Sequence, residues 1–155
     1  MSLIIGSIHF VSKSKGTIVV YEISPDKISR VGCAINESFH MSFPYLFKFQ
    51  NKIFMVPETS ENNDIRIYES IEFPYKWKLN QVVMTDIFAV DSMIFNSQNK
   101  WWLFSNINPD GGSDACSELY IFSSDNPLSG KWKPHKLNPV VVNSENARNG
   151  GILYK

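Results

Sequence analysis

Short apolar runs of four to seven residues, separated by polar turn residues, dominate the hydrophobic pattern of the chain. Val, Ile, Phe, Tyr and Trp predominate in these runs, as suits the pleated, half-buried surface of a β-sheet. The predicted strands are Thr17–Ile23, Tyr45–Phe49, Ile53–Val56, Ile65–Glu69, Ser92–Phe95, Trp101–Ser105 and Leu119–Ser123. No segment has a sustained helical period, so the pattern predicts an all-β protein.

The pattern also repeats along the chain. Gln-Asn-Lys stands between two apolar runs at residues 50–52 and again at 98–100, and Phe73–Lys78 matches Leu128–Lys133 around a Lys-Trp-Lys core. A period of about 50 residues built from short strands is typical of β-propeller blades. We therefore predict two full blades, at about residues 40–84 and 89–142. Each has an inner strand, a hairpin to a second, a third, and a fourth that contains Trp.

Two partial blades are expected to flank the full ones, within a single domain over residues 1–155. The expected division is a partial blade at 1–35, blades at 36–86 and 87–143, and a partial blade at 144–155. Gly16–Ser24 resembles the third strand of a unit that lacks its start, and Ala147–Tyr154 resembles the first strand of a unit that does not finish. Because a propeller closes by joining its first blade to its last, we expect a fragment of a longer protein or a chain that packs with a partner.

Composition narrows the classes of partner. The 155 residues include 15 basic and 15 acidic ones, and 43% are hydrophobic, enough for a packed core. This balance of charge argues against nucleic acid or an anionic membrane as the main partner. No apolar run approaches the length of a membrane span and none forms a signal-peptide core, so we expect a soluble protein, most simply cytoplasmic.

No metal or cofactor is expected. Cys33 and Cys116 are far apart in sequence and form no CxxC pair, so they do not supply a zinc site. The chain also contains no P-loop, no dinucleotide-binding fingerprint and no nucleophile elbow.

An ordered series of short motifs carries a family resemblance. The motifs are His40–Pro44, Met55–Ser60, Ile65–Tyr68, Phe73–Trp77, Val90-Asp91, Trp101–Phe104, Leu128–His135, Asn138–Val140 and Ala147-Arg148. Together they resemble the N-terminal domain of plant glucosamine inositolphosphorylceramide transferases and its bacterial relatives, which often stand beside formyltransferase-like domains. That domain is similar to the five-bladed propellers of family-43 glycoside hydrolases. The resemblance covers about residues 15 to 155.

The resemblance implies a five-bladed type of propeller and a carbohydrate or glycoconjugate as ligand. It leaves two functions open. One is a carbohydrate-binding or scaffold module that serves a glycosyl- or formyl-transferase-type domain of the parent chain. The alternative is a glycoside-hydrolase-like enzyme domain, truncated here. In the hydrolases an Asp on the first blade is the general base, and nothing similar precedes Gly16. The first function is therefore favoured, and whether the parent is an enzyme stays open.

Two carboxyl groups are the catalytic candidates, because glycoside hydrolysis normally needs two across the scissile bond. Asp91 is expected to begin the inner strand of the second full blade, where apolar neighbours favour a protonated carboxyl that suits a general acid. Glu58 follows a short apolar run and corresponds to Asn106 by the repeat. The alternatives are an Asp that satisfies loop amides and a Glu that is a solvated loop charge.

Four further residues are candidates for substrate binding. His40 and Ser42 are expected at the start of the preceding blade, where the imidazole can bind a sugar hydroxyl or pack beside neighbouring phenylalanines. Arg148 can clamp an acidic group of the substrate, or pair with Asp91 as a structural link between blades. Trp101 is the candidate for stacking on a sugar ring, although one ring of the Trp101-Trp102 pair is expected to belong to the core.

Overall fold

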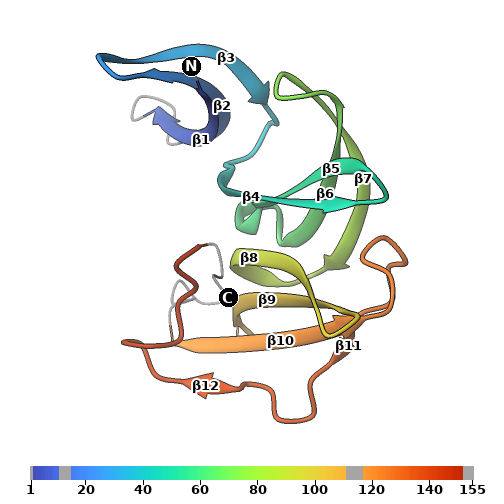
Figure 1. Ribbon diagram of the computed structural model, residues 1–155. Helices are drawn as coiled ribbons and strands as arrows, with labels where there is room; N and C mark the ends of the chain where they lie inside the picture. The colour runs from blue at the N-terminus through green and yellow to red at the C-terminus, as the bar shows by residue number, and fades with distance from the viewer. Residues whose placement is uncertain (1, 11–14, 111–116, 152–155) are drawn as a thin grey trace.

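The computed structural model describes residues 2–10, 15–110 and 117–151. These residues form three antiparallel sheets that follow one another along the chain and lie side by side (Figure 1). Within these ranges there is no α-helix, and the helical structure present is a 3-10 turn, η2, at Ser60–Asn62. The all-β prediction is confirmed.

Sheet A contains β1 (Ser2–Phe10), β2 (Lys15–Ser24) and β3 (Lys27–Ile35) in that order. Sheet B contains β4 (Ser42–Phe49), β5 (Lys52–Glu58), β6 (Asp64–Glu72) and β7 (Lys76–Thr85) in that order. Sheet C contains β8 (Phe88–Ser97), β9 (Lys100–Asn108) and β10 (Glu118–Ser124), followed by the short strands β11 (Lys133–Pro134) and β12 (Val141–Val142).

Each strand predicted between Thr17 and Ser123 lies inside an observed one, whereas β1 and β3 were not predicted. Sheets B and C fall within the predicted segments 36–86 and 87–143, and the division into blades at those boundaries stays a prediction. The final predicted strand differs from the structure, since its described part, residues 147–151, contains no strand.

The fourth position of sheet C is split between β11 and β12, which pair with opposite ends of β10. Between them, the Asn138 side chain replaces a neighbouring strand as the hydrogen-bond partner of β10. Its Oδ1 accepts a hydrogen bond from the Ile121 N–H at 2.9 Å, and its Nδ2 donates to the Ile121 carbonyl at 2.8 Å. The backbone groups of the central β10 residue are thereby satisfied without a regular strand beside them.

The repeat is visible in the backbone of the two inner hairpins. Gln50 and Asn51 have φ values of 48° and 60°, and Gln98 and Asn99 have 53° and 60°. A two-residue turn with positive φ at both positions has the type I′ form, whose twist matches that of the strands it joins. The Gln-Asn pairs therefore fix the same turn in both sheets.

A second shared feature lies near the start of each inner strand. The ladder between β4 and β5 breaks between Ser42 and Tyr45, and that between β8 and β9 breaks between Val90 and Met93. Inside these bulges, Phe43 has φ 42° and Asp91 has φ 52°. The shift that carries Gln50 onto Gln98 carries Phe43 onto Asp91. Asp91 thus lies at a bulge within β8 rather than at its start, and its counterpart is Phe43 rather than His40 or Ser42.

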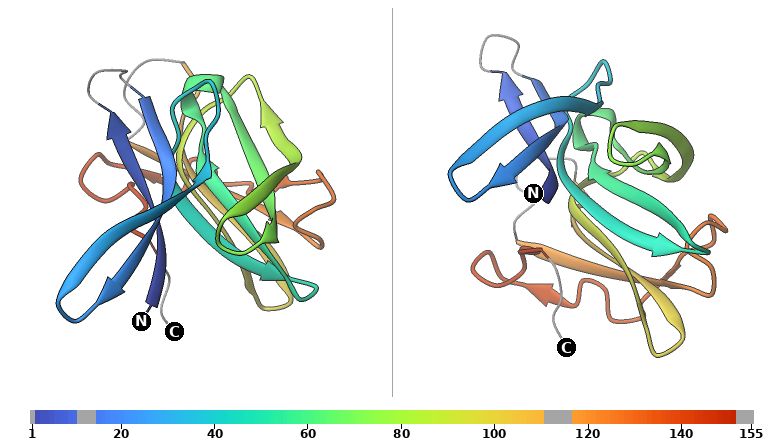
Figure 2. Two further views of the ribbon diagram at one scale, coloured as in Figure 1. Left: turned by 90° about the horizontal axis from the view of Figure 1, so that it is seen from above. Right: turned by 45° about the horizontal axis from the view of Figure 1, so that its top comes forward.

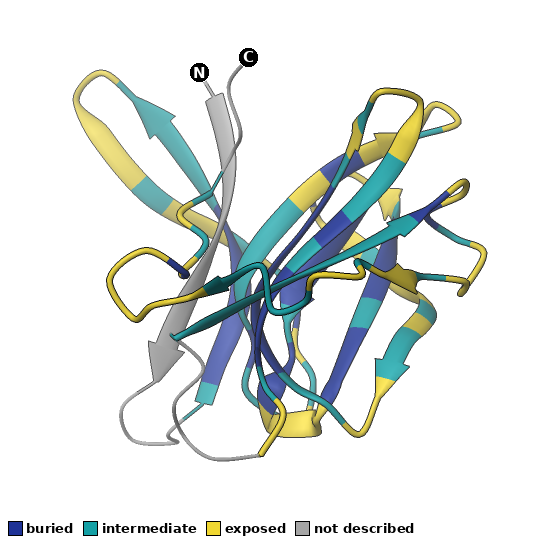
Figure 3. Ribbon diagram, turned by 90° about the horizontal axis from the view of Figure 1, so that it is seen from below, coloured by how far each residue is buried: buried dark blue, intermediate teal, exposed yellow. Residues whose placement is uncertain are grey.

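Sheet B is buried on both faces, because β5 sends alternate side chains to different cores. Phe54 and Val56 join the core between sheets B and C, which also contains Ile94 and Leu103. Met55 joins the core between sheets A and B. Figure 3 shows buried residues along the strands between sheets and exposed residues at the loops. The continuous apolar run of β5 is a consequence of this double burial.

The outer hairpin of sheet A, unlike the strands between the sheets, exposes apolar side chains to solvent. In both views of Figure 2 the β2–β3 hairpin extends away from the other sheets. Ile28 and Val31 on β3 are accordingly 68% and 42% exposed, whereas Ile18, Val19 and Val20 on β2 are fully buried. The inner part of sheet A therefore packs against sheet B, and its outer hairpin stands in solvent.

The hairpin geometry gives a stability prediction. Replacing Asn99 by Val places a β-branched residue at φ 60° and should lower the free energy of unfolding by about 1–2 kcal/mol. Asn99→Gly should preserve or slightly raise it, because Gly adopts this conformation without steric cost. Urea-induced unfolding measures both variants. Equal stability of the Val and Gly variants would contradict the type I′ turn.

Candidate functional site

The bulge in β8 holds a buried carboxylate. Asp91 is 5% exposed, and the positive φ takes its side chain out of the regular alternation of the strand. Its Oδ2 accepts a hydrogen bond from Nε of Arg148 at 2.5 Å. The Asp91 side chain is 6% exposed and the Arg148 side chain 52%. The pair therefore joins a buried negative group to a positive group that reaches solvent.

Beside the bulge, a pair of buried hydroxyls supplies one hydrogen bond to the backbone that the bulge disrupts. Ser105 donates from Oγ to the Val90 carbonyl at 3.3 Å, and its Oγ lies 2.9 Å from Oγ of Ser92. Both serines are buried. Because a buried, unpaired carbonyl is costly, these contacts help to hold the bulge that aims Asp91.

Residues 147–149, here called the arm, are fixed against sheet C chiefly through the side chain of Asn106. Asn106 is fully buried, and its Nδ2 donates to the carbonyl of Ala147 at 2.8 Å and to that of Glu118 at 3.1 Å. Its Oδ1 accepts from the Asn149 N–H at 3.0 Å, and Nδ2 of Asn149 donates to the Asp91 carbonyl at 2.9 Å. Asn106 therefore places Arg148 beside Asp91.

Sequence reasoning did not find this role of Asn106. The repeat aligned it with Glu58, and a polar residue at the end of an otherwise apolar strand was the available signal. Its partners in the arm lie 41 to 43 residues later in the chain, so only the folded structure brings them together.

Tyr120 borders the same end of sheet C. Its hydroxyl donates to Oε2 of Glu118 at 2.8 Å. Burial, followed by this hydrogen bond and the charge of Glu118, raises the pKa of Tyr120 to about 12. The phenol therefore stays protonated near neutral pH and serves as a donor.

His40 lies in a second group, between sheets A and B. Its Nδ1 accepts a hydrogen bond from the Gly16 N–H at 2.9 Å, and the Met41 N–H donates to the Gly16 carbonyl at 3.2 Å. A Cβ at Gly16 would meet the Met41 oxygen at 2.5 Å, so this close approach requires Gly. The backbone N–H of His40 donates to Oε2 of Glu61. With Nδ1 as acceptor, the neutral imidazole carries its proton on Nε2.

Glu58 and Ser42 are partners in the β4–β5 register. Glu58 is half-buried, and its Oε1 accepts a hydrogen bond from Oγ of Ser60 at 3.0 Å. The described contacts of the carboxylate candidates thus lie in two groups. Asp91 is bonded to Arg148, and Glu58 is bonded to Ser60.

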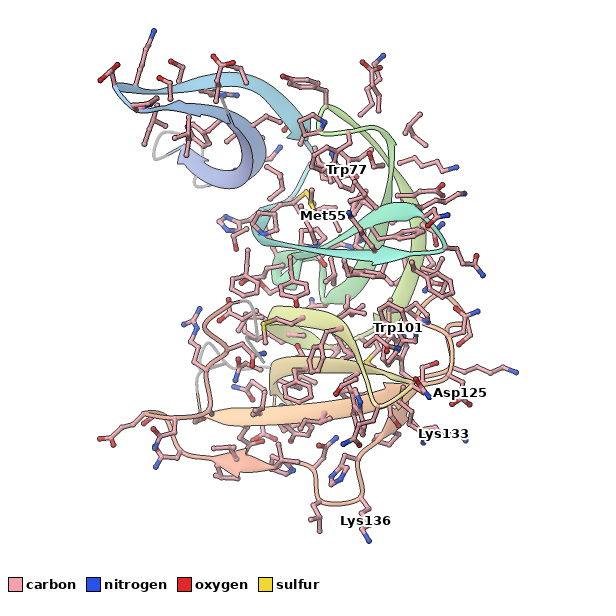
Figure 4. The ribbon with its side chains drawn as sticks, in the orientation of Figure 1. Met55, Trp77, Trp101, Asp125, Lys133 and Lys136 are labelled. Atoms are coloured by element: carbon pink, nitrogen blue, oxygen red, sulfur yellow. The ribbon has the colours of Figure 1, made fainter. Side chains whose placement is uncertain are left out.

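The two adjacent tryptophans point to opposite faces of β9. The ring of Trp101 lies 5.7 Å from that of Phe47 and 5.4 Å from that of Phe49, so it packs between sheets B and C (Figure 4). Trp102 donates from Nε1 to the Ser97 carbonyl at 3.2 Å and lines a surface hollow of about 360 Å³ with His135. Sugar stacking by Trp101 stays a prediction.

Across the part of the chain that the structure describes, no group of three or more His, Cys, Asp or Glu side chains is arranged to hold a metal ion. Within those same residues, no helix has the length and apolar character needed to cross a membrane.

The chain matches a family described as Glucosamine inositolphosphorylceramide transferase 1, N-terminal, over residues 11–155. It is 36% identical over 126 residues to Glucosamine inositolphosphorylceramide transferase 1 of Oryza sativa subsp. japonica, covering 80% of this chain and 17% of that protein. The protein of the same name from Arabidopsis thaliana is 37% identical, with 80% and 16% covered. The chain thus spans less than a fifth of these relatives. These matches confirm the family resemblance.

Solved structures share the fold. The Bacteroides ovatus Xyloglucan PUL GH43B protein superimposes with a TM-score of 0.66 at 15% identity, covering 93% of this chain and 28% of that one. A thermostable family-43 glycoside hydrolase gives 0.62 at 12% identity, with 90% and 52% covered. These likenesses confirm the prediction of a β-propeller of the five-bladed type.

Removal of the Asn106 side chain should release the arm. Asn106→Ala deletes three hydrogen bonds at a buried site and should lower the free energy of unfolding by roughly 2–4 kcal/mol. Amide hydrogen exchange should also become faster at residues 147–149. The control is Asn96→Ala, at an exposed position of β8, which should change stability by less than about 0.5 kcal/mol. Unchanged exchange in the arm would show that Asn106 does not anchor it.

Proposed function

Because the chain belongs to the family of glucosamine inositolphosphorylceramide transferase N-terminal domains, we propose that it is a carbohydrate- or glycoconjugate-binding module of a larger transferase-type protein. The observation that carries the proposal is the Asp91–Arg148 pair, held at a bulge of the inner strand β8 by Asn106 and the arm. In this proposal the pair binds vicinal hydroxyl groups of a sugar or of an inositol ring.

The chemistry of the pair supports recognition of a polyol. A carboxylate accepts hydrogen bonds from hydroxyl groups, and a guanidinium donates to hydroxyl oxygens in a planar fork. Asp91 and Arg148 present both kinds of group within 2.5 Å of each other. Adjacent hydroxyls of a sugar act as donors and acceptors at once, so such a pair matches them better than either charge alone.

Binding is favoured over acid catalysis by the contact that Asp91 makes. A general acid must direct its carboxyl group at the oxygen of the leaving group, whereas Oδ2 of Asp91 is bonded to Nε of Arg148. Hydrolysis also needs a second carboxyl group about 5–9.5 Å away. Glu58, the other candidate, lies at the end of β5 in sheet B and has its described contact with Ser60 of η2. The likeness to glycoside hydrolases supports the fold, whereas the activity has to be argued from the residues of the site.

The names of the relatives suggest the ligand class. They are named Glucosamine inositolphosphorylceramide transferase 1, and the matched region is 17% of the rice protein. We infer that the module presents a glycan or headgroup to a transferase domain elsewhere in the parent protein. His40, Ser42, Glu58 and Trp101 are proposed as further contacts for longer ligands.

Isothermal titration calorimetry of the chain with glucosamine, myo-inositol and xylo- or arabino-oligosaccharides tests the proposal. Asp91→Asn keeps the shape but removes the charge, and should weaken binding roughly tenfold or more, because hydrogen bonds to charged groups contribute about 1.5–3 kcal/mol. Arg148→Gln should have a similar effect.

Glu72→Gln is the matched control, since Glu72 forms an exposed ion pair with Lys76 on sheet B. It should bind sugars as the unmodified chain does. Equal affinity of the Asp91→Asn variant and the unmodified chain would refute the proposed site. Hydrolysis of aryl glycosides that is lost in Asp91→Asn would favour the alternative, a glycoside-hydrolase-like enzyme.

A further inference from the structure

Sheets B and C carry the same three lysines at equivalent positions. The repeat that aligns Gln50 with Gln98 aligns Lys52 with Lys100, each the first residue of a second strand. The repeat that aligns Trp77 with Trp132 aligns Lys76 with Lys131 and Lys78 with Lys133. The two clusters are therefore copies of one blade feature, and their charge partners can be compared position by position.

In sheet B the lysines are neutralised by two glutamates. Oε1 of Glu69 accepts from Nζ of Lys52 at 2.7 Å, and Oε2 of Glu69 lies 3.4 Å from Nζ of Lys78. Lys76 pairs with Glu72 at 2.5 Å. The hydrogen bond from Lys52 in particular lowers the pKa of Glu69, so that carboxylate is charged near neutral pH.

In sheet C the equivalent of Glu69 is a serine. Glu69 stands opposite Phe54 and Lys78 in the ladder, and Ser123 stands opposite Trp102 and Lys133 in the same way. Glu72 corresponds to Asn126 when it is counted from Ser123 and to Pro127 when it is counted back from Trp132, and both of these residues are uncharged. Both glutamates of the cluster are thus missing from sheet C.

The three lysines of sheet C surround a hollow of about 250 Å³. It is lined by Lys100, Lys131 and Lys133 together with Ser123, Ser124, Asp125, Asn126 and Ser129. Over the described residues no ion pair involves any of these lysines, and Asp125 is the lining carboxylate there. Figure 4 shows Asp125 and Lys133 close together at one end of sheet C. The hollow therefore carries a surplus of positive charge.

The loop that closes the hollow has a fixed shape. Ser124 and Ser129 each donate from Oγ to the Asn126 carbonyl, at 2.8 Å and 2.9 Å. The Lys131 N–H donates to Oγ of Ser129 at 3.2 Å, and Gly130 allows the turn with φ 67°. These bonds order the loop before any ligand arrives, which reduces the entropy lost on binding.

We propose that this hollow is a binding site for a phosphate group, carried by a soluble sugar phosphate or by a lipid headgroup. Three ammonium groups suit a compact oxyanion with two negative charges, and the nearby hydroxyls supply further donors. The volume lies below the usual range of about 300–1,000 Å³ for pockets of drug-sized ligands, so it fits a headgroup better than a large molecule.

The phosphate site is separate from the Asp91 site. Lys100 begins β9 and Asn106 lies six residues further along it, or ~20 Å at about 3.3 Å per residue. A single ligand that carries both a sugar and a phosphate can therefore reach both sites only in an extended conformation. The two sites can also be tested independently.

Calorimetric titration of the chain with inorganic phosphate at constant ionic strength is the first test. Lys100→Gln and Lys133→Gln should each weaken binding roughly tenfold or more. Their matched controls are Lys52→Gln and Lys78→Gln on sheet B, which make the same change in net charge and should leave phosphate affinity unchanged. Equal losses in both sheets would show a general charge effect and overturn the proposal, as would the absence of phosphate binding.

Ser123→Glu is the sharpest variant, because it restores the sheet B arrangement in sheet C. The new carboxylate should pair with Lys100 and Lys133 as Glu69 pairs with Lys52 and Lys78, and phosphate binding should be lost while thermal stability is kept. Ser123→Gln has nearly the same size without the charge and should retain most of the binding. Phosphate binding by Ser123→Glu equal to that of the unmodified chain would contradict the proposal.

The two sources of phosphate are separated by their probes. Glucose 6-phosphate tests a soluble ligand, and flotation with phosphatidylcholine vesicles that contain phosphatidylinositol 4-phosphate, whose 4-phosphate is likewise a monoester, tests a headgroup. In either case, binding should be lost in Ser123→Glu and retained in Ser123→Gln. Binding of either probe that is insensitive to Ser123→Glu would overturn this assignment of the hollow. Sugar binding at Asp91 should be unaffected by these variants.

Discussion

Burial of sheet B on both faces is the constraint on which the rest of the structure depends. The β5 side chains alternate between two cores, so neither face of the sheet can be satisfied without a neighbour. This requirement sets the sheets side by side and brings the inner strands β4 and β8 into contact. The bulge of β8 is then supported by sheet B on one side, and surrounding structure of this kind is the condition for keeping a buried carboxylate at a positive φ.

The repeat explains how one blade design serves two purposes. Sheets B and C share their hairpin turns, their bulges and their lysines, as expected for blades built on one plan. They differ at positions where the backbone is equivalent in the two sheets but the side chains are chemically different. Phe43 and Asp91 occupy the same bulge, and Glu69 and Ser123 the same place in the ladder. In sheet B the first position is the apolar Phe43, and at the second Glu69 neutralises the lysines. In sheet C the first position is the carboxylate Asp91, and Ser123 leaves the lysines without a charge partner among the residues that the structure describes. Both proposed sites therefore lie in sheet C.

The inner and middle strands could be predicted because burial imposes an apolar pattern on them, as in Ile53–Val56. The outer strand β3 was missed because most of its residues are exposed, which leaves no such pattern. Sequence reasoning also offered the Asp91–Arg148 contact as one alternative, and the structure shows that contact. The anchoring by Asn106 was out of reach, because its hydrogen bonds depend on tertiary docking of a segment with no regular structure of its own. The exchange of Glu69 for Ser123 needed the strand register, which periodicity does not supply.

The anchoring of the arm has a thermodynamic consequence for any ligand of Arg148. The arm is held by a small set of hydrogen bonds and one buried side chain, Ala147, so we expect its local opening to cost less free energy than unfolding of the sheets. Only the docked form presents the guanidinium beside Asp91. The apparent affinity is then the intrinsic affinity scaled by the docked fraction, and a ligand that bridges both residues in turn stabilises the docked arm. Local order at residues 147–149 and occupancy of the site beside the inner strand β8 are therefore thermodynamically linked.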